Sequence, residues 1–148
     1  MTRFIGEYRA KTDDKGRIVF PSAFKAMIGP EQSPRLVVRK NLFEPCLDIC
    51  TMDEWIRESE EIKSRLNFFN REHDRLWRGY MSSCATVEPD GKLGRITIPR
   101  QLLDSIGVEK EVVFAGNDHK IELWARDRFE SSRIDETEYV SLAEKILG

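Results

Sequence analysis

The chain has 148 residues, of which 40% are hydrophobic and 34% are charged, and its formal net charge is −2. This balance is typical of a globular protein and argues against disorder. Without an overall positive charge, any nucleic-acid binding must come from local basic patches. The amino terminus lacks a basic start followed by an apolar run, and no stretch approaches the ~18 apolar residues of a membrane span. We therefore expect a cytoplasmic protein with no membrane partner.

The first predicted elements are a strand over residues 4–11, FIGEYRAK, and a returning strand over residues 17–20, RIVF. The turn DDKG joins them, and Gly16 in this turn can adopt a positive φ, so the pair is interpreted as a β-hairpin. Pro21 suits the first turn of a helix, SAFKAMI supplies an apolar face, and Gly29 ends it.

Two further strands, RLVVRK and CLDICT, follow around the turn NLFEPC, so this unit is ββαββ. Apolar residues at helical spacing then predict helices in TMDEWIRESEEIKSRL, with Thr51 or Asp53 as N-cap, and in NREHDRLWRGYM. The alternating charges of residues 57–65 indicate a solvated helix face.

The second half of the chain repeats the first. At a constant offset, Gly16, Arg17, Ile18, Pro21 and Gly29 match Gly94, Arg95, Ile96, Pro99 and Gly107. EVVFAG and KIELWA supply the later strands, and RFESSRIDETEYVSLAEKILG should hold one or two helices. Neither half of ~50 residues would bury much surface alone, so we expect one shared core.

The pair DDKGRIVFP and GKLGRITIP, together with FIGEY, IELW and the helical insert, resembles the MraZ family of bacterial transcription regulators. The similarity runs from about residue 4 to 130. It implies a mainly β, α+β fold, in which two AbrB-like swapped-hairpin repeats form one pseudo-two-fold β-barrel with covering helices between and after them. The implied domains are a first repeat (4–51), a helical connector (52–80), a second repeat (81–126) and a C-terminal helical tail (127–148).

The resemblance also implies a function. It predicts a sequence-specific regulator that binds double-stranded promoter DNA at short direct-repeat boxes upstream of the division and cell-wall gene cluster. The protein would act as a ring-shaped homo-oligomer on the nucleoid, without enzymatic activity, cofactor or small-molecule substrate. The alternative is a structural or protein-interaction module of the same fold, an antitoxin-like partner without specific DNA binding.

The family's signature at the loop that meets DNA is an Asp, three residues and an Arg. Asp13 and Arg17 fit this pattern, but five positions separate Asp90 from Arg95. The repeats align upstream of the turn when Asp13 is paired with Asp90. The second loop therefore contains an extra residue, most simply Leu93.

Arginine can grip phosphate or the edge of guanine, and lysine adds a mobile charge beside it. The candidate DNA-binding residues are Arg17, Lys15, Arg95, Lys92, Arg9 and Lys11. The candidate loop-positioning residues are Asp13, Gly16, Asp90 and Gly94. We expect Asp13 to orient Arg17 rather than to contact phosphate; the alternative is that the pair merely pins a hairpin. A coplanar basic face with a spacing near ~34 Å, one DNA turn, would favour DNA over a protein partner.

Other chemistry has weaker support. A zinc set could be imagined from Cys46, Cys50, Cys84, His73 and His119. However, Cys46 and Cys50 are four residues apart on a strand, too far to chelate one ion, so no metal site is expected. Nothing near Cys84 indicates an activated nucleophile, and the turn GKLG lacks the phosphate-loop pattern.

The aromatic residues are interpreted as core or subunit-interface residues rather than a base-stacking platform, because no basic residues alternate with them. They are Trp55, Trp77, Trp124, Phe68 and Phe69. The break between helices at residues 66–70 is the best candidate for an exposed apolar interface.

Overall fold

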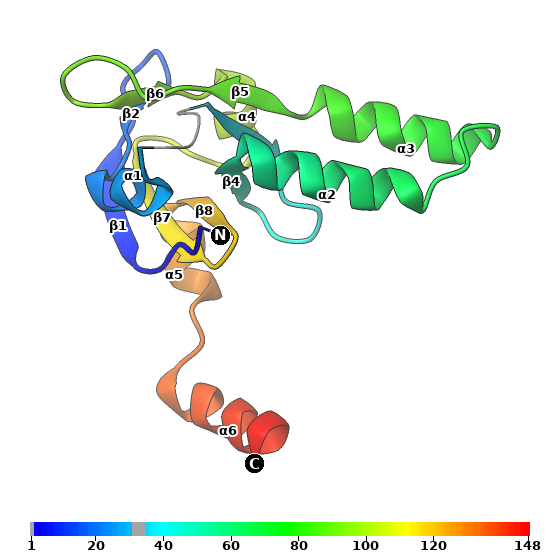
Figure 1. Ribbon diagram of the computed structural model, residues 1–148. Coiled ribbons are helices and arrows are strands. Elements are labelled where there is room, and N and C mark those ends of the chain that lie inside the picture. The colour runs from blue at the N-terminus through cyan, green and yellow to red at the C-terminus, as the bar shows by residue number, and fades with distance from the viewer. Residues whose placement is uncertain (1, 31–34) are drawn as a thin grey trace.

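The computed structural model describes residues 2–30 and 35–148 (Figure 1). In chain order the elements are β1 (Glu7–Lys11), β2 (Arg17–Val19), α1 (Ser22–Ile28), β3 (Leu36–Lys40), β4 (Leu47–Thr51), α2 (Met52–Ser64), α3 (Arg71–Ser82), β5 (Ala85–Val87), β6 (Arg95–Thr97), α4 (Arg100–Ser105), β7 (Glu111–Asn117), β8 (Lys120–Ala125), α5 (Arg126–Ser132) and α6 (Glu136–Leu147). The predicted mixed α+β class and the order of the predicted elements are confirmed.

The strands of the two halves are interleaved. One antiparallel sheet has the order β1-β7-β8-β4-β3-β5, and β2 and β6 form a separate two-stranded ribbon. β1 therefore pairs with β7 of the second half, and β5 pairs with β3 of the first. Among the described residues the strands form these two sheets, and no single closed barrel is recorded.

This interleaving corrects the simple hairpin expected for residues 4–20. Within the described residues, the only strand pairing recorded across the predicted turn is a bridge from Thr12, just after the first predicted strand, to Ile18 of the second. β2 instead pairs with β6, with Ile18 directly opposite Ile96. Both isoleucines are almost completely buried, so this pairing places them together in the shared core.

The core lies between the sheet, the ribbon and the short helices α1 and α4. Its buried side chains come from both halves; the bulkiest include Phe4, Phe24, Phe114, Leu36, Leu47, Ile49, Leu103, Ile106 and Ile121. Phe24 of α1 makes edge-to-face contacts with Phe4 and Tyr8. Because neither half encloses this cluster alone, the expectation of one shared core is confirmed.

The helices between the halves cover less of the sheet than expected. α2 and α3 run side by side and project beyond it (Figure 1). Thr51 is the N-cap of α2, accepting a hydrogen bond from the Glu54 backbone N–H at 3.2 Å. The aromatic side chains of this hairpin pack mainly on one another, since Trp77 stacks on Tyr80 and contacts Phe68 edge-on. Phe69, at the turn, is fully exposed.

α6 also departs from the expected covering role. It stands away from the sheet at the end of a short connection, and none of its residues is buried (Figure 1). No helix in the described part of the chain is long and apolar enough to cross a membrane.

Candidate nucleic-acid interface

The two loops that hold the signature residues lie at the same end of the molecule, on either side of the ribbon (Figure 1). Strand alternation gives the ribbon two faces. Ile18 and Ile96 point into the core, whereas Arg17, Val19 and Thr97 are exposed and Arg95 is half-buried. Both arginines therefore belong to the outward face.

The first loop is a tight turn organised by Asp13. One oxygen of its carboxylate, Oδ1, accepts hydrogen bonds from the backbone N–H groups of Lys15 and Arg17, both at 2.9 Å. The other oxygen, Oδ2, accepts from Nε of Arg17 at 2.6 Å. The carboxylate thus fixes both the turn and the direction of the Arg17 side chain, and the remaining guanidinium nitrogens stay available to an anion.

The hydrogen bonds to Asp13 also determine its ionisation. The backbone hydrogen bond from Arg17 is the largest factor that lowers the pKa of Asp13, and the side-chain bond from Arg17 acts in the same direction. Asp13 therefore stays ionised at neutral pH. Its negative charge is already matched by Arg17, which limits repulsion of a nearby phosphate.

Gly16 completes the first loop. Its φ is 79°, and its carbonyl oxygen accepts a hydrogen bond from Ile98 N–H of the second half at 2.9 Å. A Cβ here would lie 2.4 Å from the Ile98 carbonyl oxygen. Gly94 makes the equivalent bond, since its carbonyl accepts from Phe20 N–H at 3.0 Å. The two loops are therefore anchored to each other's strands by matching contacts.

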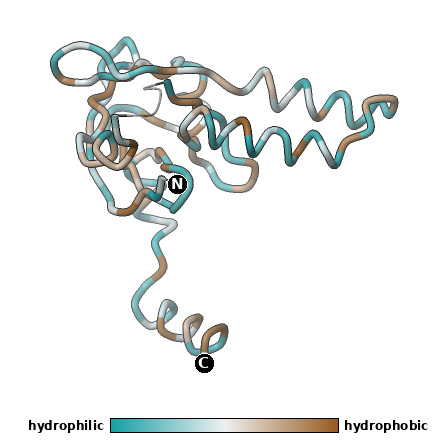
Figure 2. The backbone as a smooth tube through the Cα atoms, viewed as in Figure 1, coloured by the Kyte–Doolittle hydropathy of each residue, from teal (hydrophilic) through white to brown (hydrophobic). Residues whose placement is uncertain are grey.

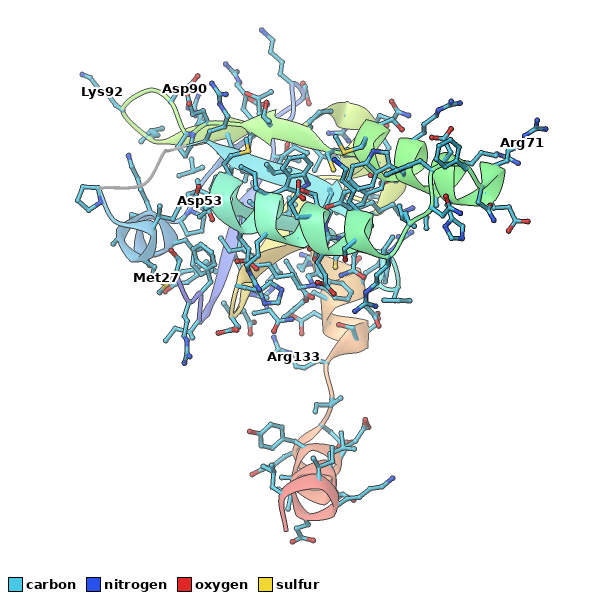
Figure 3. The ribbon with its side chains drawn as sticks, turned by 45° about the vertical axis from the view of Figure 1, so that its right-hand side comes forward. Met27, Asp53, Arg71, Asp90, Lys92 and Arg133 are labelled. Carbon is cyan, nitrogen blue, oxygen red and sulfur yellow. The ribbon has the colours of Figure 1, made fainter. Side chains whose placement is uncertain are left out.

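The second loop is built differently. Asp90 and Arg95 exchange two backbone hydrogen bonds, both 2.9 Å, and Gly91 and Gly94 both have positive φ. Asp90 thus occupies the place of Asp13, which supports an inserted residue rather than a lost acid. Within the described residues no side-chain bond joins Asp90 to Arg95, however, so Arg95 lacks the clamp that holds Arg17. Figure 3 shows Lys92 extending outward from this loop.

The other candidates differ in availability. Lys15, Lys92 and Lys11 are exposed. Arg9 forms an ion pair with Glu130 of α5, so it would have to give up this partner to bind a phosphate. The cations of the two loops are therefore the more available group.

The spacing of about 34 Å between basic loops, one turn of DNA, does not occur within one chain. Arg17 lies opposite Thr97 and Arg95 lies opposite Val19, which makes the two arginines diagonal neighbours. Their Cα atoms are then about 7–8 Å apart. One chain offers a single basic surface, and a spacing of one DNA turn would require loops from different subunits.

The sequence analysis did not identify two residues on the outward face of the ribbon. Val19 and Thr97 project from the ribbon between the two arginines, and the alternation in RIV and RIT could have indicated them. Leu93 is 59% exposed beside Lys92, so the inserted residue adds an apolar side chain to the loop.

The structure groups a different set of possible metal ligands from the cysteines and histidines considered in the sequence analysis. Among the described residues, Cys46, Asp48 and Glu122 place ligand atoms within 4.8 Å of one another. The Lys120 ammonium nitrogen lies 3.2 Å from Asp48 Oδ1 and 3.7 Å from Glu122 Oε2. Burial raises the pKa of the Cys46 thiol well above its usual value. Arg39 lies 2.7 Å from the other Asp48 oxygen, so two cations already pair with the acids of this group, which is therefore interpreted as a buried ion-pair cluster.

Comparison with known proteins adds independent information. Residues 81–143 match the family model described as "MraZ protein, putative antitoxin-like". "Transcriptional regulator MraZ" of Bacteroides thetaiotaomicron is 34% identical over 148 residues, which is all of this chain and 94% of that protein. The protein of the same name from Lachnoclostridium phytofermentans is 36% identical over 138 residues, 93% of this chain and 92% of that protein.

The fold and the loops define a protein of two interleaved repeats that presents a basic ribbon at one end. The similarity over the whole length makes the assignment specific: the chain belongs to the MraZ family, whose named relatives are transcriptional regulators.

Proposed function

We propose that this chain regulates transcription by binding double-stranded promoter DNA through the loops at residues 12–17 and 90–95. Arg17, Lys15, Arg95 and Lys92 supply the contacts, Arg9 and Lys11 extend the surface, and Asp13, Gly16, Asp90 and Gly94 set the loop conformations. The observation that carries the proposal is the Asp13–Arg17 clamp beside Arg95 on one outward ribbon face.

A single chain offers few cations, so its affinity for DNA should be weak and sensitive to salt. Repetition of the surface in a ring-shaped homo-oligomer would raise the effective concentration for each further contact. We infer that short direct-repeat boxes upstream of the division and cell-wall gene cluster are the target. The protein would then work in the cytoplasm, on the nucleoid, and without catalysing a reaction.

The test is binding to a labelled duplex from the gene's own upstream region, measured over a salt series. We expect Arg17→Ala and Arg95→Ala each to weaken binding by about tenfold or more and to reduce the salt dependence, because each removes a charged contact per subunit. Arg78→Ala is the matched control, since Arg78 is an exposed arginine on α3 away from the ribbon. It should bind as the wild type does.

Equal binding to a scrambled duplex would contradict sequence specificity. Loop variants that bind like the wild type would contradict the interface itself and favour the alternative, a protein-interaction module of the same fold.

A further inference from the structure

Helix α6 exposes an apolar face that no other described residue buries. Tyr139, Leu142 and Ile146 recur at i, i+3 and i+7 and are 64%, 40% and 72% exposed. Figure 2 shows hydrophobic segments along this detached helix. A 12-residue helix is marginal in water without tertiary contacts. Its stability therefore requires a partner for this face.

The charges beside the apolar face are mainly negative. Glu136 and Glu138 lie on opposite flanks of the stripe at helical spacing, and Asp135 precedes the helix as its N-cap. Lys145, in the last turn, is the one basic residue of the helix and lies on the same flank as Glu138. A membrane surface is a poor partner, because interfacial helices usually carry lysine and arginine on the polar face and bind anionic lipids. An apolar site with a basic rim would match α6.

Such a site lies between the helical hairpin and the β3–β4 loop. It is a groove of about 740 Å³, and its lining includes the apolar Leu42, Ile62 and Leu76 and the basic Lys40, Arg65 and Arg75. Leu42 and Leu76 are 66% and 56% exposed there. The rim is basic. Among the described residues no ion pair involves Lys40 or Arg75, and Arg65 contacts Glu61 only at the surface.

The chain's own α6 is directed away from this groove. Arg133, in the connection before α6, pairs with Glu7 of β1 at 2.5 Å and lies over the Phe129 ring at 4.9 Å. Figure 3 shows Arg133 at the point where the chain leaves the body. β1 is four strand spacings from β3 in the sheet order, or about 19 Å. The connection is thus held on the side opposite the groove.

We propose that α6 of one subunit docks in the α2–α3 groove of a second copy of this chain. The apolar stripe would cover Leu42 and Leu76, and the flanking Glu136 and Glu138 would face Lys40 and Arg75. This proposal rests on the self-association included in the proposed function and specifies its contact. Since helix and groove are different surfaces, the interface is head-to-tail, and it can propagate from subunit to subunit until a ring closes.

The test uses two full-length variants that each destroy one surface. Leu142→Glu with Ile146→Glu disables the helix, and Leu76→Glu disables the groove. All three positions are exposed, so the fold should persist, and circular dichroism with thermal melting checks this. We expect the wild type to be oligomeric by light scattering and each variant alone to be monomeric. Ser141→Glu, on the polar face of α6, is the control and should keep the wild-type mass.

Mixing the two variants gives the decisive measurement. Each retains the surface that the other lacks, so a mixture should form one-to-one heterodimers of twice the monomer mass and nothing larger. A groove variant that still self-associates would mean that α6 pairs with α6. Variants with the wild-type mass, a mixture that stays monomeric, or a monomeric wild type would each overturn the proposal.

The readout is separate from DNA binding. Arg17→Ala should keep the wild-type mass whether or not the loops bind DNA. Failure of the DNA proposal therefore leaves this test intact, and failure of the docking proposal leaves the loop variants informative.

Discussion

Gly16 and Gly94 occupy equivalent positions in the two loops, and their surroundings differ. Both have positive φ, but a Cβ at Gly16 would meet the Ile98 carbonyl at 2.4 Å, whereas a Cβ at Gly94 would meet nothing within 4 Å. The two glycines therefore match in the sequence but differ in the space available for a side chain. Only at Gly16 does the backbone of the opposite half lie too close for a Cβ atom.

We predict that Gly16→Ala is the more destabilising of the two substitutions. Gly94→Ala should cost about 1–2 kcal/mol, the usual penalty of left-handed backbone for an L-residue. Gly16→Ala adds the backbone clash and should cost at least ~1 kcal/mol more. Urea unfolding of both variants measures the difference, and equal losses would show that the close approach to Ile98 can relax.

Asp13 makes the stability of the first loop depend on pH. A carboxyl group whose pKa is lowered on folding stabilises the folded state above its unfolded pKa, and this contribution disappears as the pH falls through the lowered folded pKa. We predict that the wild type melts above Asp13→Asn at neutral pH and that the gap closes in acid below the usual carboxyl range. Thermal melts at several pH values check this, and a gap independent of pH would contradict it.

At the scale of elements, the α2–α3 hairpin is tied to the sheet by a polar cluster. Arg39 of β3 contacts Asp48 at 2.7 Å and donates to Glu58 of α2 at 2.6 and 2.5 Å, and Tyr80 of α3 donates to Glu58 at 2.7 Å. Burial alone would raise the pKa of Glu58, but the bonds from Arg39 and Tyr80 outweigh it and hold the pKa below its usual value. Glu58 thus joins both helices to the sheet.

We predict that Glu58→Gln loosens the hairpin and costs about 1.5–3 kcal/mol, the range for hydrogen bonds to a charged group. Hydrogen exchange should accelerate in α2 and α3 more than in the sheet. Glu61→Gln is the control, because its pair with Arg65 is exposed and should contribute less than ~1 kcal/mol. Similar exchange rates in both variants would mean that packing, and not Glu58, holds the hairpin.

At the scale of the whole molecule, the two halves share one core and should unfold together. Ile18 and Ile96 face each other across the ribbon and are 1% and 0% exposed. We predict that Ile18→Ala and Ile96→Ala each cost about 2–5 kcal/mol, with a single transition seen by circular dichroism and tryptophan fluorescence. Two separated transitions would show that the halves fold independently.

The family resemblance and the local patterns predicted much of this architecture. The tandem motif marked both loops, and the helix and strand periods marked the elements. Periodicity could not supply the partner of each strand. RIVF alternates in the same way whether it pairs with its neighbour or with β6, and the family likeness, not the local pattern, implied the interleaving.

The sequence by itself determined the two repeats, the mixed fold class and the positions of the loop cations, because these depend on local conformation and on residue type. Tertiary structure decided the rest. It pairs Arg9 with Glu130 and brings Arg17 and Arg95 together on one ribbon. Within residues 2–30 and 35–148 it also leaves the apolar side chains of α6 and of the α2–α3 groove exposed. Each of these features depends on contacts between residues that are far apart in the sequence. An apolar stripe has the same sequence pattern whether it packs on its own core or remains exposed.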